Sequence, residues 1–307
     1  MSRILVTGGA GFIGSHVVDA LVEAKHKVFV IDDLSSGKKA NVNKKAKFFR
    51  LDIRNKRLAE IFHKIKPDYV FHLAAQKSVK KSVLDPAYDA EVNIIGSINL
   101  FENCRQYKVK KIIFSSTGGA LYGDTHVMPT PETHHEAPIS PYGVAKLSIE
   151  KYLYYYRQVY GQQYVILRYA NVYGPRQDPE GEAGVVAIFL DRILTNKQPY
   201  INGHGRQRRD YVYVSDVVKA NLLSLKRNIL GIFNIGTARE TSVNELFEQI
   251  RKISKTTFKQ KHRTGLPGEQ QRSCLSYKKF NKACNWHPSI SLNIGLKQTY
   301  EWFVKKY

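Results

Sequence analysis

A tyrosine and a lysine four residues apart are the clearest candidates for chemistry in this sequence. Ser140 followed by Pro141 is typical of a helix start, so Tyr142 and Lys146 are expected on one face of a helix. An ammonium beside a phenol, or beside a cofactor ribose next to it, favours the phenolate over its usual pKa of about 10. The spacing therefore predicts that Tyr142 is a general base.

A hydroxyl-rich strand end is the second candidate. Ser115, Ser116 and Thr117 close the apolar segment that begins at Lys111, and ligands of open α/β sheets bind at the carboxyl ends of strands. Thr117 is therefore predicted to hydrogen-bond the reacting hydroxyl. By itself a Tyr and Lys four apart would more often mark an amphipathic helix with a surface lysine, so the catalytic interpretation depends on a cofactor site elsewhere in the chain.

A glycine-rich turn near the N-terminus supplies that site. It follows the apolar segment Ile4–Thr7 and places glycines three apart, at Gly8, Gly11 and Gly14. Glycines let a pyrophosphate approach bare amides at a helix N-terminus. The next predicted strand ends at Asp32, where a carboxylate suits ribose hydroxyls and repels a 2′-phosphate, so the turn predicts NAD rather than NADP.

Two further strand ends are expected along the cofactor. Asp52 and Ile53 follow a third strand, expected between Val28–Ile31 and Tyr69–His72, and are expected to hold the adenine. Leu73, Ala74 and Ala75 follow the fourth and offer small side chains along the dinucleotide.

The elements that must position these residues alternate along the first half of the chain. A helix is expected at Gly14–Ala24, and strands at Ile4–Thr7, Val28–Ile31, Tyr69–His72, Lys111–Ser115 and Tyr164–Tyr169. This rhythm predicts an α/β fold, a Rossmann-type doubly wound parallel sheet over residues 1–170. Residues 171–307 are predicted to form a smaller C-terminal substrate-binding domain, with a strand at 231–236 returning to the first sheet.

Composition excludes several classes. Hydrophobic residues at 43% and charged residues at 24% are typical of a folded protein. No leader pattern and no apolar run of about 18 residues is found, which predicts a cytoplasmic protein without a membrane partner. Three cysteines without C-x-x-C spacing predict no metal.

The net charge of +22 raises nucleic-acid binding as an alternative, but the lysines are spread thinly without a basic tail. We therefore expect no nucleic-acid partner. An NAD-sensing or RNA-binding scaffold is the non-enzymatic alternative, and the intact Tyr142 and Lys146 argue against it.

Motifs along nearly the whole chain resemble the UDP-glucose 4-epimerases of the extended short-chain dehydrogenase/reductase family. They are TGGAGFIGSH at 7–16, HLAAQ at 72–76, SSTGGALYGD at 115–124, SPYGVAK at 140–146, RYANVYGPRQ at 168–177 and RDYVYVSD at 209–216. The resemblance implies a tightly held NAD, Tyr142 as the base at the sugar O4, Lys146 on the nicotinamide ribose and Thr117 as the third catalytic residue. It also implies a transient 4-keto sugar that turns over in the site.

The full predicted set of NAD contacts gathers around the strand ends and the catalytic helix. It consists of Gly8, Gly11, Phe12, Ile13, Gly14, Asp32, Asp33, Ser35, Ser36, Gly37, Asp52, Ile53, Leu73, Ala74, Ala75, Gln76, Asn93, Ser115, Tyr142, Lys146 and Tyr169.

Sibling enzymes of that family differ directly after the threonine. The 4,6-dehydratases carry an Asp-Glu pair there and the glucuronate decarboxylases a Glu, whereas Gly118 and Gly119 follow Thr117 here. Without a carboxylate to run an elimination, epimerisation of UDP-glucose and UDP-galactose is the expected reaction. Another nucleotide-sugar epimerase, a dehydratase or a decarboxylase is the alternative.

The resemblance also implies how a UDP-sugar substrate is held. Thr117 and Tyr142 are expected at the sugar, Asn171 at the sugar or phosphate, and Val185 and Val186 near the uracil. Arg209 is expected on the diphosphate, because its guanidinium donates two charge-assisted hydrogen bonds; a surface charge beside Arg208 is the alternative.

The late loop departs from the family pattern. Relatives read R-P-G-D where this chain has Leu266 to Glu269, so Arg272 or Arg263 is predicted to replace the lost phosphate contact. Ser273 stands where N-acetyl-accepting relatives have a small residue, which predicts that UDP-N-acetylglucosamine is turned over as well.

A homodimer is the last expectation. The helical segments 86–107 and 141–160 carry apolar and aromatic residues on more than one side, and in the family these helices pair across a dimer. Core packing would explain the tyrosines of the second segment equally well.

Overall fold

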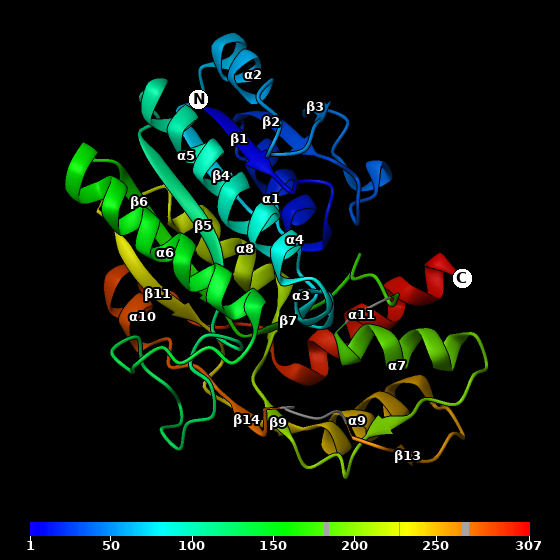
Figure 1. Ribbon diagram of the computed structural model, residues 1–307. Coiled ribbons are helices and arrows are strands. Elements are labelled where there is room, and N and C mark those ends of the chain that lie inside the picture. The colour runs from blue at the N-terminus through cyan, green and yellow to red at the C-terminus, as the bar shows by residue number, and fades with distance from the viewer. Residues whose placement is uncertain (181–183, 227, 266–269) are drawn as a thin grey trace. The chain divides into compact units, whose positions relative to one another are not determined.

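The computed structural model describes residues 1–180, 184–226, 228–265 and 270–307 (Figure 1). Two compact units are present, and each is built from three segments of chain. Unit 1 comprises Met1–Leu121, Glu136–Arg168 and Val218–Phe233, and unit 2 comprises Tyr122–His135, Tyr169–Val217 and Asn234–Tyr307. The predicted limits were 1–170 and 171–307, with a strand near 231–236 returning to the first domain. Beyond that strand, residues 122–135 and 218–230 also interleave between the units. The assignment of one domain to NAD and one to substrate stays a prediction.

A seven-stranded parallel sheet forms the centre of unit 1, in the order β11-β6-β5-β4-β1-β2-β3. The strands are β1 (Arg3–Thr7), β2 (Lys27–Asp32), β3 (Lys47–Arg50), β4 (Tyr69–His72), β5 (Lys111–Thr117), β6 (Gln163–Tyr169) and β11 (Gly231–Ile235). β1 pairs in parallel with β2 on one side and with β4 on the other. The predicted doubly wound sheet is confirmed, and β11, the segment expected to return to it, is its outermost strand beside β6.

The strand order reverses between β1 and β4, which pair at their carboxyl ends through Thr7 and His72. From β1 the chain continues to β2 and β3 on one side, and later to β4, β5 and β6 on the other. A crevice at such a reversal is where dinucleotides bind in this kind of sheet.

Helices cover the sheet, and α5 and α6 lie side by side in front of its strands in Figure 1. Their buried faces join a core that includes Phe62, Phe101 and Leu153. The helices of this unit are α1 (Phe12–Glu23), the 3-10 turn η1 (Lys39–Asn41), α2 (Leu58–Ile65), α3 (Val79–Leu84), α4 (Pro86–Ala90), the π-helix η2 (Glu91–Ile95), α5 (Gly96–Gln106) and α6 (Pro141–Tyr160).

Unit 2 contains small sheets and several helices. β7 (Asn171–Tyr173) pairs with β10 (Tyr211–Tyr213), β9 (Arg208–Arg209) lies between β12 (Thr241–Ser242) and β14 (Arg272–Ser273), and β8 (Ile201–Asn202) pairs with β13 (His262–Arg263). The helices are α7 (Val185–Leu194), α9 (Val243–Ser254), α10 (Lys278–Cys284) and α11 (Leu292–Lys306). The remaining helix, α8 (Val214–Leu223), begins in unit 2 and continues into unit 1.

Within the described ranges, none of the helices is long and apolar enough to cross a membrane. The same residues contain no group of three or more His, Cys, Asp or Glu side chains that could hold a metal ion.

Candidate active site

The glycine-rich turn joins β1 to α1 so tightly that side chains are excluded. Gly8 has a φ of +71°, and a Cβ there would lie 2.5 Å from the amide nitrogen of Ala74. A Cβ on Gly14 would lie 2.1 Å from the carbonyl oxygen of Gly8. The turn is held by hydrogen bonds from the Gly8 amide to Ile31 O (2.8 Å) and from the Gly11 amide to Gly8 O (3.2 Å). Glycine is therefore required for close packing as well as for backbone conformation.

The start of α1 is suited to an anion. Its N-cap is Gly11, which offers no capping side chain, and the first turn of this fully described helix carries no acidic residue. The first amides of a helix have no intrahelical partner, and the helix dipole favours negative charge there. The predicted contacts Phe12, Ile13 and Gly14 form this first turn, so their amides fit the pyrophosphate of NAD.

Asp32 ends β2 and its carboxylate is fixed by the backbone. Oδ2 accepts a hydrogen bond from the Ala10 amide (3.0 Å), and Oδ1 accepts one from the Leu34 amide (2.9 Å). Burial raises the pKa of Asp32, although these amide hydrogen bonds oppose the shift. Gly37 packs against the same carboxylate, 2.7 Å from Oδ1 to a Cβ built there. A carboxylate fixed beside the turn suits the hydroxyls of a ribose.

The remaining strand-end residues lie around the same edge of the sheet. Asp33 accepts hydrogen bonds from the amide and the hydroxyl of Ser35 (2.9 and 2.7 Å). Asp52, predicted at the adenine, accepts a hydrogen bond from Arg54, with an Nη2 to Oδ2 distance of 2.6 Å. Burial raises the pKa of Asp52, but the bond to Arg54 more than offsets this and lowers it overall. Ile53 is buried in the core.

A chain of buried hydrogen bonds lies behind the loop that follows β4. The Ser97 hydroxyl donates to Asn93 O, so Nε2 of His72 must donate to Ser97 Oγ (2.9 Å). Nδ1 of His72 then accepts from Thr7 Oγ1 (2.8 Å), which in turn accepts from the Ala74 amide (3.3 Å). A neutral His72 with its proton on Nε2 therefore fixes this loop to β1.

Two of the predicted NAD contacts bind each other in this region. The Gln76 amide donates to Asn93 Oδ1 (2.9 Å), and Asn93 Nδ2 donates to Gln76 O (3.0 Å). Both side chains also bind Asp89, a residue that the sequence analysis missed.

The predicted catalytic pair stands at the start of α6, where Ser140 and Pro141 predicted a helix to begin. Ser140 Oγ accepts from the Gly143 amide (3.2 Å), and the Tyr142 amide donates to Ser82 Oγ (3.1 Å). Lys146 is 3% exposed, and its Nζ lies 5.8 Å from the centre of the Tyr142 ring. That nitrogen donates to the carbonyl of Ser115 (3.0 Å) at the end of β5. Helix and strand end thus place the ammonium beside the phenol.

The pKa values around this pair differ from the expectation. The sequence analysis predicted that Lys146 would favour the phenolate of Tyr142, but burial, aided by the charge of Asp89, raises the pKa of Tyr142. Burial lowers the pKa of Lys146 to about 8, although Asp89 and Glu150 oppose this shift. Burial therefore opposes the predicted effect of Lys146 on Tyr142, because a helix pattern gives the distance between two side chains but not their loss of solvent.

Thr117 ends β5 close to the first turn of α6. Its Oγ1 accepts from the Ala120 amide (3.2 Å), and a Cβ on Gly143 would lie only 2.6 Å from Ala120 O. The segment that carries Thr117 is therefore packed against the turn that carries Tyr142.

Four of the predicted substrate residues of unit 2 belong to its strands and loops. Nη2 of Arg209 donates to Gln270 O (2.6 Å), and Arg272 pairs with Glu240 (2.5 Å). Asn171 is exposed at the start of β7, and Ser273 is buried in β14.

The remaining predicted substrate residues differ in how deeply they are buried. Val185 begins α7 and is half-buried, whereas Val186 is buried in the core. Arg263, the alternative to Arg272, donates to Asn202 Oδ1 (2.6 Å). The departure at Leu266 to Glu269 lies outside the described residues.

Comparison with known proteins places this site in a family. The model of the NAD dependent epimerase/dehydratase family matches residues 4–236. The chain belongs to this family.

Three solved structures of similar proteins cover almost the whole chain. UDP-glucose 4-epimerase from Thermotoga maritima, solved with UDP-glucose, is 52% identical, with 99% of each chain covered and a TM-score of 0.97. UDP-glucose 4-epimerase from Thermus thermophilus, solved with NAD, is 43% identical, with 99% of this chain and 100% of that chain covered and a TM-score of 0.95. UDP-N-acetylglucosamine 4-epimerase from Methanobrevibacter ruminantium, solved with UDP-N-acetylmuramic acid, is 38% identical. The match covers 100% of this chain and 99% of that chain, with a TM-score of 0.95.

A buried ion network behind α6 was not predicted from the sequence of this member of the NAD-dependent epimerase/dehydratase family. Arg168 is fully buried and binds Glu150 (2.5 Å) and Glu136 (2.6 Å), while Ser116 Oγ donates to Glu150 Oε1 (2.6 Å). Glu150 lies one turn after Lys146 on the same face of α6. A carboxylate at this spacing was the signal in the sequence from which a buried ion pair could have been predicted.

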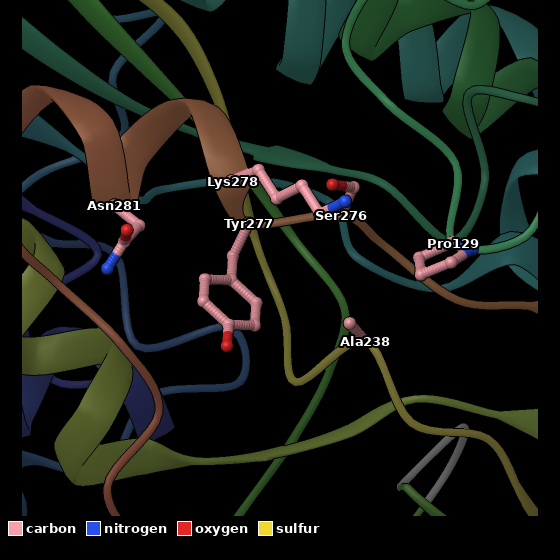
Figure 2. A pocket seen from close by; sticks show the side chains of 6 residues that line it. All are labelled: Pro129, Ala238, Ser276, Tyr277, Lys278 and Asn281. Atoms are coloured by element: carbon pink, nitrogen blue, oxygen red, sulfur yellow. The ribbon is translucent and has the colours of Figure 1, made fainter.

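A pocket of about 220 Å³ in unit 2 is separate from these residues. Figure 2 shows its lining side chains, which are Pro129, Ala238, Ser276, Tyr277, Lys278 and Asn281. None of the predicted site residues lines this pocket, so we do not assign it to the reaction.

Proposed function

We propose that this protein is a UDP-glucose 4-epimerase that interconverts UDP-glucose and UDP-galactose with bound NAD. The names of the Thermotoga and Thermus relatives, at 52% and 43% identity over nearly the full chain, support this activity. The observation that carries the proposal is the pair Tyr142 and Lys146 at the carboxyl end of β5, with Lys146 anchored on Ser115 O at 3.0 Å.

The residues of the pair have complementary tasks. Bound NAD supplies a hydride acceptor that later returns the hydride. Tyr142 takes the proton of the sugar O4 and gives it back, and Thr117 hydrogen-bonds the same oxygen. Lys146 stays protonated below a pKa of about 8 and stabilises negative charge on the phenol oxygen.

Elimination chemistry is the alternative within the same family, and the sequence at Thr117 disfavours it. Loss of water from the sugar needs an acid and a base beside the ring. Gly118 and Gly119 follow Thr117 and offer neither. A product with the mass of the substrate would support epimerisation, and a product lighter by one water would support a dehydratase.

Residues of unit 2 are proposed to hold the UDP part. Arg209 is proposed on the diphosphate, with Arg272 as a second cation, Asn171 at the sugar and Val185 and Val186 at the uracil. The hydrogen bonds of Arg209 to carbonyls of its own unit hold its guanidinium in place. This supports a role as a fixed anion-binding group.

UDP-N-acetylglucosamine is proposed as a further substrate. Ser273 is a small side chain, and the Methanobrevibacter relative is named for the N-acetylated sugar. Ser273→Tyr should abolish conversion of UDP-N-acetylglucosamine while UDP-glucose still reacts. Equal loss of both activities would argue against a role of Ser273 in sugar choice.

A homodimer is proposed from the exposed surface of unit 1. Ile95, Val144, Tyr152, Tyr155 and Val159 are exposed on η2 and α6, which pack together. Sedimentation should give twice the chain mass, and Tyr155→Glu should give a monomer. A monomeric wild-type protein would contradict the proposal. Cytoplasmic location and the absence of a nucleic-acid partner stay predictions of the sequence.

The activity itself is tested directly. The purified protein is incubated with UDP-glucose without added NAD, and the anomeric proton signals are followed by NMR. Growth of the UDP-galactose signal supports both the reaction and a tightly held cofactor. If no conversion occurs even with added NAD, the proposed function is wrong.

A further inference from the structure

A buried carboxylate near the catalytic pair has no role in the proposed chemistry. Asp89 lies in α4 and is 1% exposed. Its Oδ1 accepts hydrogen bonds from Gln76 Nε2 (2.7 Å) and Asn93 Nδ2 (3.0 Å). Its Oδ2 has no hydrogen-bond partner in the part of the chain that the structure describes. An unpaired oxygen on a buried carboxylate is costly, so a role beyond binding two amides is indicated.

The charge of Asp89 acts on both catalytic side chains. α4 packs against α6, and the Asp89 carboxylate raises the pKa of Tyr142 and the pKa of Lys146. The reverse effect is also present, because Lys146 acts to lower the pKa of Asp89 although burial raises it overall. The ammonium and the carboxylate therefore stabilise each other's charged forms.

The other titratable groups around Tyr142 and Lys146 are neutral, paired with an opposite charge, or near solvent. Glu150 on α6 is bound by the buried Arg168. His72 on β4 is neutral, because burial, aided by the charge of Lys146, lowers its pKa to about 3. Lys80 and Lys81 on α3 and Glu91 on η2 are exposed, and Glu91 meets Arg54. The half-buried Glu102 on α5 pairs with Arg105. Asp89 is thus the buried carboxylate near Lys146 without an arginine or lysine ion pair among the described residues.

We propose that Asp89 is a positioning residue of the epimerase: its ionised carboxylate is the buried counter-charge of Lys146 and fixes Gln76 and Asn93. This inference rests on the proposed function. Asp89 is not expected to touch the sugar. It keeps the ammonium protonated at the cost of making the phenol less acidic, so it sets the pH range in which the pair works.

A purely structural role makes a different prediction. If Asp89 only ties Gln76 and Asn93 together, the amide oxygen of an asparagine can accept the same two hydrogen bonds. Asp89→Asn would then lower the rate equally at every pH, or leave it unchanged. Loss of a counter-charge instead lowers the pKa of both Tyr142 and Lys146, because each is raised by the carboxylate.

The test is the pH profile of kcat for UDP-glucose, measured on the NAD-loaded protein. With Asp89→Asn we expect both limbs to move to lower pH by about one unit, as is typical of one nearby charge. The activity ratio of variant to wild type should then be about 10 on the acidic limb and about 0.1 on the alkaline limb, a change of about a hundredfold. Asp89→Ser, also neutral, should shift the profile in the same direction if Asp89→Asn does not fold.

Matched controls remove a carboxylate from the same stretch of helix without removing a buried one. Asp85→Asn keeps a good N-cap for α4, and Glu91→Gln changes an exposed side chain on η2. Neither should move the profile. An unshifted profile in both Asp89→Asn and Asp89→Ser would overturn the inference, as would an equal shift in the controls. A wild-type protein without epimerase activity would instead overturn the proposed function.

Discussion

Gly14→Ala tests the dinucleotide turn with the smallest possible change. Gly14 lies in the first turn of α1, where alanine would ordinarily favour the helix by about 1 kcal/mol. Here the added Cβ would lie 2.1 Å from Gly8 O and 2.9 Å from Gly8 C. Ordinary contacts between such atoms are about 3.5 Å, so the helix start must move away from the turn by about 1 Å.

The expected result follows from comparing the two effects. Overpacking of this kind costs about 1–3 kcal/mol, which exceeds the gain in helix propensity. We expect a net loss of up to about 2 kcal/mol in the free energy of unfolding of the NAD-free protein. The same displacement moves the amides proposed to bind the pyrophosphate, so NAD affinity should fall at least about tenfold.

The assay measures both quantities on one preparation. NAD is released by denaturation and measured per chain, and denaturant unfolding is followed on the NAD-free protein. Gly161→Ala is the matched control, because Gly161 has a φ of +69° but no atom within 4 Å of an added Cβ. It should lose about 1 kcal/mol of stability from backbone strain and keep its NAD. A Gly14→Ala protein with full NAD content and unchanged stability would refute the reasoning.

Three further predictions concern single side chains. Tyr142→Phe should lower kcat about 100-fold or more without changing the melting temperature, whereas Tyr200→Phe, at an exposed tyrosine, should leave kcat unchanged; full activity of the first variant would reject the base assignment. The pH profile of kcat in the wild type should change slope near pH 8, because Lys146 with a pKa of about 8 loses its ammonium there, and a profile without a change of slope in that range would contradict this role. Lys111→Met should lower the free energy of unfolding in urea by about 2–4 kcal/mol, since Nζ of the buried Lys111 donates to the carbonyls of Ser224 (3.0 Å), Lys226 (2.6 Å) and Ile229 (3.1 Å). Lys110→Met, at an exposed neighbour, should change it by less than about 0.5 kcal/mol, and similar losses in both would refute the special role of Lys111.

Much of unit 1 could be predicted from local patterns. The glycine turn, the strand end at Asp32 and the helix start at Ser140 depend on residues that are neighbours in the chain. Backbone conformation and side-chain period are set at that range, so the order of elements and the shared face of Tyr142 and Lys146 followed.

The division into units could not be predicted with the same success. Residues 122–135 and 218–233 leave the half of the chain in which they stand and join the other unit. Their composition does not indicate which unit they join, because that depends on which other segments of the chain pack against them.

The sequence by itself determined which residues could do chemistry and the family to which they belong, because motif spacing is a local property. The tertiary structure alone decided their electrostatics. Burial raises the pKa of Tyr142 and lowers that of Lys146, and Asp89, 53 positions before Tyr142 in the chain, acts on both. Loss of solvent and the approach of distant charges are set by how helices and strands pack, so no pattern of neighbouring residues could have supplied them.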